Sequence, residues 1–530
     1  MRTTALALFL LAVSGPQAAP AQPAPGAPAA PDVMELKLGL ADAIARGIEN
    51  NLGVAIARFD PAAADYDLDA AWGLHDPLVT GNFTHQSTDT PVASALQRSS
   101  TLFERVNRGG VGLVGLVPRL GWTYEFGYSG VGTTSTSSIQ SLSTEFRANL
   151  TSKLTVPLLK GFLWGKEWTQ VRTAGIGRGI ARDEFRTALM DTVQGIARAY
   201  WNHAARKLDY EVGEKSLETA RALLEQTRAQ YEVGVVSRVE VVEAEAGVAD
   251  REFRLISAEN TYRTAQDQLI DAVFGTRLRP TTRVELTETD DPDRVEAYQV
   301  DEGVAAEKAF ALRPELAVAR ERVAQQELQV KFALNQRLPR LDLVGSYGYQ
   351  GLAGIPNPNP LFGIPLPKGA VPRDYSDTSD FFFKGRNNVD WSGGAVFSIP
   401  LGNSSARANH RKSQVLLRQL QTQALRTEQT IILEVRKAVR DLRSAIQGIE
   451  AANRRLEAAN EQLRAEQIRL EHGESTPFEV LQREEDLVEA ESQKIGALQI
   501  YHDSVADLER AQGTILRDRG IVIEDALSLR

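Results

Sequence analysis

The chain has 530 residues, 24% of them charged, a net charge of −9 at pH 7 and no cysteine. The acidic balance argues against a general nucleic-acid-binding surface. The lack of cysteine excludes disulfide bonds, thiolate metal sites, a cysteine nucleophile and a lipid-modified N-terminal cysteine. The six histidines have no metal-ligand spacing, and no catalytic arrangement of histidine, serine and carboxylates is recognisable. We therefore predict no enzyme activity, no cofactor and no metal site.

The N-terminal residues have the pattern of an export signal. Arg2 precedes a short apolar run at 6–13, and small residues at 19–21 offer a cleavage site. We interpret residues 1–21 as a signal peptide and the Pro/Ala-rich residues 22–35 as a disordered leader. No later stretch has about 18 consecutive apolar residues, so passage through a membrane requires β-strands.

Residues 36–275 form a first structural repeat. Helical periodicity at 42–72 changes to strand-like alternation, which is cleanest at 146–158. There, apolar side chains lie on one face and polar or charged side chains on the other, as in a tilted strand between lipid and water. A long helix at 167–232 and a shorter helix at 239–273 follow.

A second structural repeat occupies residues 301–516, after a polar linker at 276–300, and a tail follows at 517–530. Its elements follow the same order, with a helix at 303–338, strands at 341–349 and 391–401, a long helix at 404–472 and a last helix from 477. An offset of 239 maps Leu217 onto Leu456 and Leu224 onto Leu463, so the heptads of the two long helices have the same phase. This duplication is the main organising feature of the sequence.

Residues 109–130 look like an additional hairpin, with Pro118 near its bend. The hairpin could cross the membrane and widen the sheet, or lie outside it. Because extra crossings come in pairs and must match closure of the sheet, we favour a hairpin exposed at the cell surface or to the periplasm.

Two clear strands per repeat give about four strands per chain, and four strands cannot close in lipid. Three chains supply 12 strands and 12 helical columns. The sequence thus predicts an α+β membrane protein, in which a trimeric 12-stranded outer-membrane β-barrel is continued by a long periplasmic α-helical barrel.

The duplicated pattern resembles the TolC-like outer membrane efflux protein family, also called outer membrane factors. The resemblance covers about residues 36–516 and is carried by Leu40-Ala41-Asp42-Ala43-Ile44, Arg313-Pro314-Glu315-Leu316, Val156-Pro157-Leu158-Leu159, Ile399-Pro400-Leu401-Gly402, Tyr231-Glu232-Val233-Gly234 and Leu470-Glu471-His472-Gly473. It implies a homotrimer in outer membrane lipid that extends into the periplasm. It also implies a periplasmic adaptor and an inner-membrane pump as partners, in an efflux or type I secretion system.

The two helical turns become the periplasmic tips, and the resemblance implies that they dock the adaptor. The docking candidates are Val233, Gly234, Val235, Val236, His472, Gly473, Glu474 and Ser475. The alternative interpretation is purely structural: each turn restarts a helix after a glycine break. Capping boxes at Ser237 and Thr476, with Pro477 in the first helical turn, support that interpretation.

Three copies of an acid near the tip would form a cation-attracting ring. The candidates for this constriction are Glu240, Glu243, Glu479 and Gln482. Glu479 cannot both cap its helix and face the lumen, and most charges on helix surfaces are simply solvated. The ring is therefore a hypothesis.

Two other classes of protein remain as alternatives. A periplasmic adaptor or coiled-coil interaction protein would have one helical hairpin and no lipid-facing strands. A secreted enzyme would need an active site. The duplication and the strand at 146–158 favour the channel.

Overall fold

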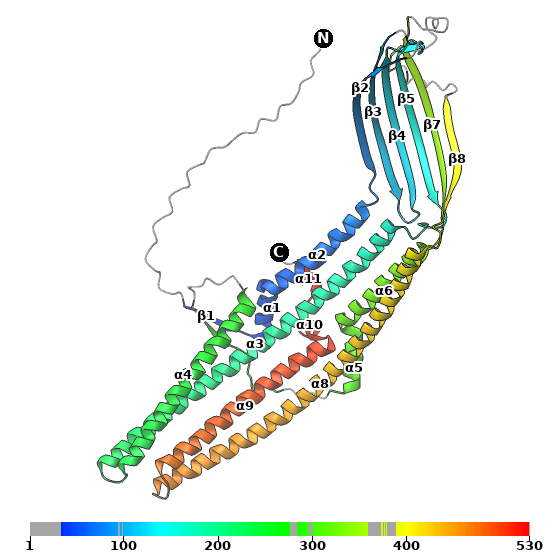
Figure 1. Ribbon diagram of the computed structural model, residues 1–530. Coiled ribbons are helices and arrows are strands. Elements are labelled where there is room, and N and C mark those ends of the chain that lie inside the picture. The colour runs from blue at the N-terminus through cyan, green and yellow to red at the C-terminus, as the bar shows by residue number, and fades with distance from the viewer. Residues whose placement is uncertain are drawn as a thin grey trace, which may run out of the picture.

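The computed structural model describes residues 33–93, 96–97, 99–275, 283–295, 300–358, 373–374, 376, 378 and 388–528. This part of the chain is elongated, with a β-sheet at one end and long helices that run from it to two hairpin tips (Figure 1). The predicted signal peptide and nearly all of the predicted leader lie outside the described residues. No described helix is both long and apolar enough to cross a membrane.

Six strands form one antiparallel sheet. Their order in space is β2-β3-β4-β5-β7-β8, so the two repeats meet where β5 pairs with β7. The strands are β2 (Leu78–Pro91), β3 (Thr101–Val117), β4 (Trp122–Ser135), β5 (Leu142–Pro157), β7 (Arg340–Pro356) and β8 (Val389–Ser398).

The expectation of about four strands per chain is wrong. Residues 109–130, which we expected to form a hairpin outside the membrane, belong to β3 and β4 of the same sheet. β3 pairs with all of β2, and β4 pairs with β5. The backbone N–H and C=O groups of both strands gain partners on each side within the sheet, which a separate hairpin would lack. The first repeat therefore contributes four described strands and the second contributes two.

The sheet has one apolar and one polar face. Paired residues point to the same face of an antiparallel sheet. Val111 pairs with Tyr128, which pairs with Leu150 on the apolar face, whereas Glu125 pairs with Lys153 on the opposite face. The alternation seen in one segment of sequence thus continues in register over neighbouring strands.

The helices occur in two sets of nearly equal lengths. The first set is α1 (Leu40–Asn50), α2 (Leu52–Gly73), α3 (Lys166–Glu232) and α4 (Arg238–Phe274), and the second is α5 (Glu302–Leu312), α6 (Pro314–Asn335), α8 (Ser404–Glu471) and α9 (Pro477–Gln512). Corresponding helices contain 11 and 11, 22 and 22, 67 and 68, and 37 and 36 residues. The long helices are each about 100 Å in length. This agreement supports an internal duplication.

Each set has a break between its first two helices, at 51 and at 313, so the single helices expected at 42–72 and 303–338 are each divided in two. In the first set, the Asn51 side chain accepts hydrogen bonds from the N–H groups of Gly53 at 2.8 Å and Val54 at 3.3 Å. In the second set, Arg313 occupies the break before Pro314. Proline has no N–H and disfavours helical conformation in the residue before it, so the break is fixed by sequence.

The helices lie side by side in a single layer of columns. α3 packs against α2 and α4 on one side and against α6 and α9 on the other, and α8 packs against α6 and α9 (Figure 1). The α8 heptad residues Val435, Leu442 and Ile449 are buried in a core with Tyr501 and Leu508 of α9. This seam therefore joins α8 to its own chain, and the opposite side of α8 forms one lateral edge of the molecule.

A second, smaller sheet packs beside the middle of α3, in a region that we call the waist. β6 (Arg283–Glu288), within the segment predicted as a linker, pairs in parallel with β1 (Val33–Leu38). α10 (Ile515–Asp518), which spans the end of the predicted second repeat and the start of the predicted tail, and α11 (Ile523–Ser528), within that tail, pack near it. These pieces share a core with α3 that contains Leu38, Val284, Leu286, Tyr200, Ile515, Leu516 and Ala526.

Candidate functional site

The first tip is the turn that ends α3 and begins α4. Gly234 has a left-handed φ of +80°, which glycine adopts without steric cost. The N–H of Val235 donates to the C=O of Gln230 at 2.9 Å, as in a Schellman motif. Val233 and Val235 are 75% and 72% exposed, and Val236 is half-buried. This tip therefore presents apolar side chains to its surroundings.

A complete capping box starts α4. The Ser237 side chain accepts from the backbone of Glu240, and the N–H of Ser237 donates to Glu240 Oε1 at 3.2 Å. Glu240 is thus held at its own helix end. Glu243, about one turn farther along, is exposed and makes no ion pair with another described residue. Of these two acids, Glu243 is the one whose carboxylate takes no part in the cap.

The second tip has the same turn with a different closing contact. His472 ends α8, and Gly473 has a φ of +76°. The N–H of Glu474 donates to a carbonyl of the last turn of α8 at 2.9 Å. The hydroxyl of Ser475 donates to Glu466 of the same hairpin. Ser475 therefore fastens the turn to its own helix.

The cap of α9 is only partly the box that the sequence suggested. Thr476 accepts from the N–H of Glu479 at 3.4 Å, and Pro477 occupies the first turn. The return bond, in which the N–H of Thr476 would donate to the Glu479 carboxylate, is not formed between these described residues. Glu479 and Gln482 are both exposed, so the Glu479 carboxylate is free of the capping role.

Two arginines of α4 join the first hairpin to the second above the tips. Arg251 donates to the backbone C=O of Leu481 at 3.1 Å, and Arg254 donates to Glu485 at 2.6 Å. Glu484 is buried, and burial raises its pKa despite the nearby charge of Arg251. This link is not predictable from the sequence, because its partners are about 230 residues apart and share no local pattern.

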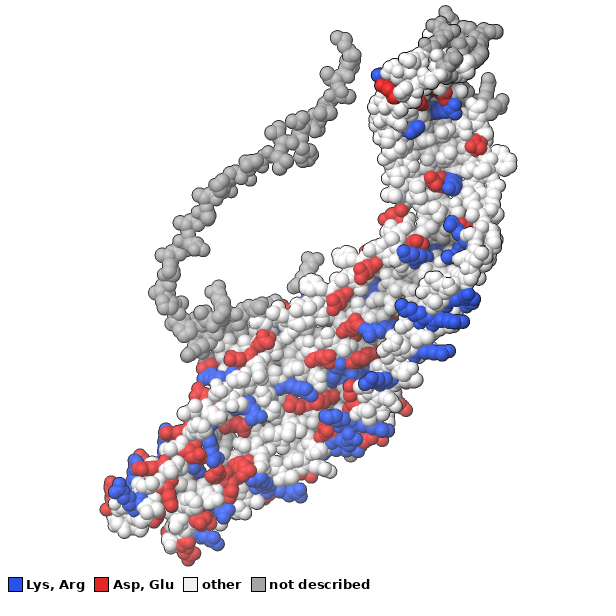
Figure 2. Space-filling model, viewed as in Figure 1, with Lys and Arg blue, Asp and Glu red and all other residues white. Residues whose placement is uncertain are grey.

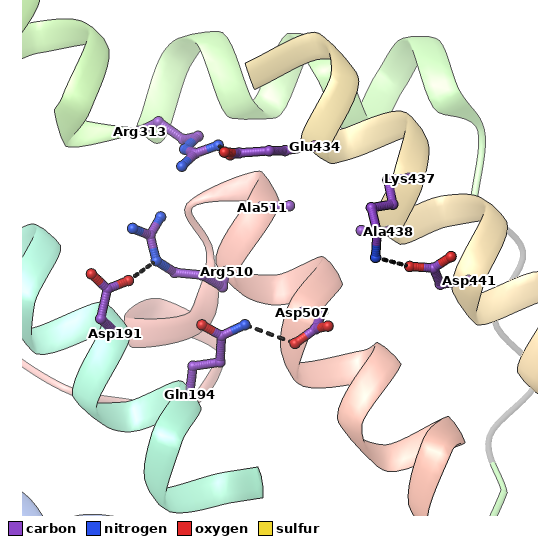
Figure 3. Close-up of a pocket in the computed structure, with 10 residues that line it drawn as sticks. All are labelled: Asp191, Gln194, Arg313, Glu434, Lys437, Ala438, Asp441, Asp507, Arg510 and Ala511. Carbon is purple, nitrogen blue, oxygen red and sulfur yellow. Dashed lines mark hydrogen bonds and ion pairs between the residues drawn. The ribbon is translucent and has the colours of Figure 1, made fainter. Parts of the chain in front are cut away.

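A charged cavity lies where α3, α8 and α9 meet the break between α5 and α6 (Figure 3). Arg510 donates to Asp191 and to Glu315, both at 2.6 Å, and Arg313 donates to Glu315 at 2.9 Å and contacts Glu434. Burial alone would raise the pKa of Glu315, but the arginine hydrogen bonds and charges lower it to about 2. The ion pairs around this cavity connect the helices that meet there. No group of acids and histidines in the described chain could hold a metal.

Both lateral edges of the chain are open. β2 and β8, the first and last strands of the sheet, are exposed along their whole lengths. Edge strands leave a row of N–H and C=O groups ready to pair with another strand. The helical columns end at the same two sides, with α2 and α4 on the side of β2 and α8 on the side of β8 (Figure 1).

A sheet with one apolar face, carried on two tandem helical hairpins about 100 Å long, defines the class of outer membrane channel proteins. The chain matches the family model for outer membrane efflux proteins over residues 110–273 and 305–514. It belongs to this family. Because the family comprises channels, the prediction that the chain is not an enzyme is confirmed.

Solved structures share the fold. The Campylobacter jejuni outer membrane channel CmeC is 14% identical with a TM-score of 0.61, over 92% of this chain and 89% of its own. The Vibrio cholerae outer membrane protein VceC is 17% identical with a TM-score of 0.61, over 89% and 96%. The open state of the Neisseria gonorrhoeae channel MtrE is 15% identical with a TM-score of 0.61, over 90% and 89%. At these identities the likeness concerns the fold. No curated protein matches the sequence.

Proposed function

We propose that three copies of this chain form one channel through the outer membrane and into the periplasm. The observation that carries the proposal is the pair of open edges. β2 and β8 are both fully exposed, and an open sheet edge is not tolerated in lipid. Pairing β8 of one copy with β2 of the next closes the sheet and brings the matching helical columns together.

Six strands per chain make this an eighteen-stranded barrel, in place of the twelve strands expected from the sequence. Strands about 4.8 Å apart and tilted by about 40° give a perimeter of roughly 110 Å for eighteen strands and roughly 75 Å for twelve. Twelve helical columns spaced about 9 Å apart also give roughly 110 Å. The six-stranded sheet is therefore the one whose perimeter matches that of the helical tube.

The polarity of each face of the sheet indicates whether it contacts lipid or water. The apolar face, with residues such as Val111, Tyr128 and Leu150, contacts lipid, and the face with Glu125 and Lys153 lines the aqueous channel. This arrangement is typical of outer-membrane barrels, which are apolar outside and polar inside. The helices then extend the conduit into the periplasm.

The tips are the proposed docking sites for a periplasmic adaptor, which links the channel to an inner-membrane pump. Exposed Val233 and Val235 at one tip and half-exposed Phe478 at the other offer apolar contacts, and such residues are enriched in protein interfaces. A pump that expels small molecules and a type I secretion system both fit this arrangement. The periplasmic adaptor class fits poorly, because the described chain has two hairpins and a six-stranded sheet.

The proposal is tested by extracting the chain from outer membranes in detergent. We expect a native mass of three chains and stepwise conductance in planar bilayers. Recovery as a monomer in the soluble periplasm would contradict the proposal. Chemical cross-linking before extraction, followed by identification of the attached adaptor and pump, distinguishes efflux from protein secretion.

A further inference from the structure

The face of α2 that points away from α3 is apolar with an acidic border. Leu52, Phe59 and Tyr66 follow one another at seven-residue steps, which place them on one side of the helix. Phe59 and Tyr66 are 72% and 73% exposed. Asp60 and Asp67 directly follow the two rings, are exposed and make no ion pair with another described residue. Asp67 also lines a cavity that α2 shares with α3 and α6, so it lies at the margin of the ring-bearing face. This helix face is therefore unpartnered in the single chain.

The face of α8 that points away from α6 is basic. Arg411, Arg418 and Leu425 follow one another at seven-residue steps and are exposed. From Ser404 to Thr427 the helix carries five Arg or Lys residues and no Asp or Glu. Figure 2 shows basic side chains projecting from this edge of the molecule. Neither arginine forms an ion pair with another described residue.

The exposed faces of α2 and α8 lie at the same distance from the β-sheet. α2 ends at Gly73 just before β2, and α8 begins at Ser404 just after β8. Distances along both helices can therefore be measured from the same end of the sheet. Successive seven-residue steps lie about 10, 21 and 32 Å from that end. The residues at equal steps are Tyr66 and Arg411, Phe59 and Arg418, and Leu52 and Leu425.

We propose that α2 of one copy packs on α8 of the next copy through these three matched pairs, an inference that rests on the proposed channel assembly. The guanidinium groups lie over the rings of Tyr66 and Phe59, where cation–π attraction is favourable. The neighbouring carboxylates of Asp60 and Asp67 pair with the same guanidinium groups. The leucine pair closes the lower end of the contact.

The charges also determine which edges meet. An acidic edge that contacted a second acidic edge would be repelled, as would two basic edges. Only head-to-tail contact of unlike edges is favourable, and such contacts close into a ring when the rotation fits. The α2–α8 contact thus directs the open sheet edges towards the correct partners.

Cysteine cross-linking tests the register. The chain has no cysteine, so the variant Tyr66→Cys/Arg411→Cys introduces its only two thiols, and each single-cysteine variant shows whether identical positions link to each other. We expect covalently linked oligomers after mild oxidation of outer membranes. The control Tyr66→Cys/Arg418→Cys is offset by about 10 Å and should remain monomeric in denaturing gels, because a disulfide requires Cα atoms within about 7 Å. Equal linkage in both variants, or none in the first, would overturn the register.

Charge reversal provides a second test that does not require a disulfide. We expect Asp60→Lys/Asp67→Lys or Arg411→Glu/Arg418→Glu to reduce the fraction of native trimer about tenfold, and the four changes together to restore it. Unchanged trimer in either reversed set, or no restoration in combination, refutes the contact. In the latter case the basic face acts on another partner, such as lipid head groups. A monomeric wild-type chain would refute the channel assembly instead.

Discussion

At the residue scale, Glu315 shows how a single carboxylate fastens the helix break of the second repeat. It lies between Arg313 and Arg510, which come from the break and from α9. Burial opposes its ionisation, but the two arginines outweigh burial and lower its pKa to about 2. A lowered folded-state pKa stabilises the fold above the unfolded value near 4.5. That stabilisation is lost as the pH falls towards 2.

We therefore predict that Glu315→Gln lowers the free energy of unfolding by about 2–3 kcal/mol at pH 7. The difference from wild type should shrink as the pH falls from 4.5 towards 2, since the wild-type carboxylate is then protonated as well. Unfolding followed by circular dichroism over this pH range measures the effect. Glu307→Gln, an exposed acid of α5, is the control. A constant difference at all pH values would contradict the role of the charge.

The acids at the tips yield a second prediction at this scale. Glu243 and Glu479 are exposed and free of capping bonds through their carboxylates, whereas Glu245 pairs with Arg228 at 2.6 Å. If the free acids ring the lumen, Glu243→Ala and Glu479→Ala reduce cation selectivity and block by multivalent cations. Single-channel recording measures both quantities, and Glu245→Ala is the control. Unchanged selectivity in both test variants would eliminate the ring.

At the element scale, the link between the two hairpins contains one buried contact and one exposed contact, whose strengths can be compared. Arg251 is 9% exposed, donates to Leu481 and lies beside the buried Glu484. Arg254 and Glu485 form an exposed ion pair. We predict that Arg251→Ala destabilises the lower hairpins by about 3 kcal/mol, because it leaves a buried carboxylate uncompensated. Arg254→Ala should cost less than about 1 kcal/mol.

Hydrogen exchange in the lower halves of α4 and α9 measures this difference locally. Protection there should fall strongly in Arg251→Ala and little in Arg254→Ala, while the waist remains unchanged. Equal loss of protection in the two variants would mean that burial does not determine the strength of the link.

The two sides of α8 lead to a further prediction for this element. Leu442 is 2% exposed in the core shared with α9, whereas Leu425 is 62% exposed on the outer side. Leu442→Asp places a charge in that core and should prevent folding of the chain. Leu425→Asp should leave the chain folded and lower only the amount of trimer. Trypsin resistance reports the fold and native mass reports the trimer. Equal trypsin sensitivity would contradict the assignment of the two sides.

Features that depend on neighbouring residues could be predicted from the sequence, whereas features that depend on distant residues could not. The long helices, the glycine turns and the Ser237 cap depend on neighbouring residues, so their patterns are readable. Gly47 lies within α1, where an added Cβ would meet the side chain of Ile196 in α3 at 2.3 Å, so the need for glycine there depends on a distant residue. The glycines between 109 and 115 obscured the alternation of β3, whose place depends on pairing with β2 and β4. The Arg251 link likewise depends on a distant partner.

At the scale of the whole molecule, the β3–β4 hairpin decides the width of the proposed barrel. β2 and β4 run in one direction and β3 and β5 in the other, so removal of the pair preserves the direction of every remaining strand. Deleting residues 101–135 leaves four strands per chain and twelve per trimer. The perimeter of the sheet would fall from roughly 110 Å to roughly 75 Å, while the helical tube keeps its width.

We predict that this deletion variant assembles poorly, and that any channels it forms have a clearly lower conductance than wild type. The physical reason is the mismatch between a narrowed sheet and twelve unchanged helical columns, which strains the short connections between strands and helices. Planar-bilayer recording measures the conductance, and circular dichroism confirms that the helices persist. A deletion variant with wild-type conductance and wild-type trimer stability would show that β3 and β4 do not form part of the channel wall.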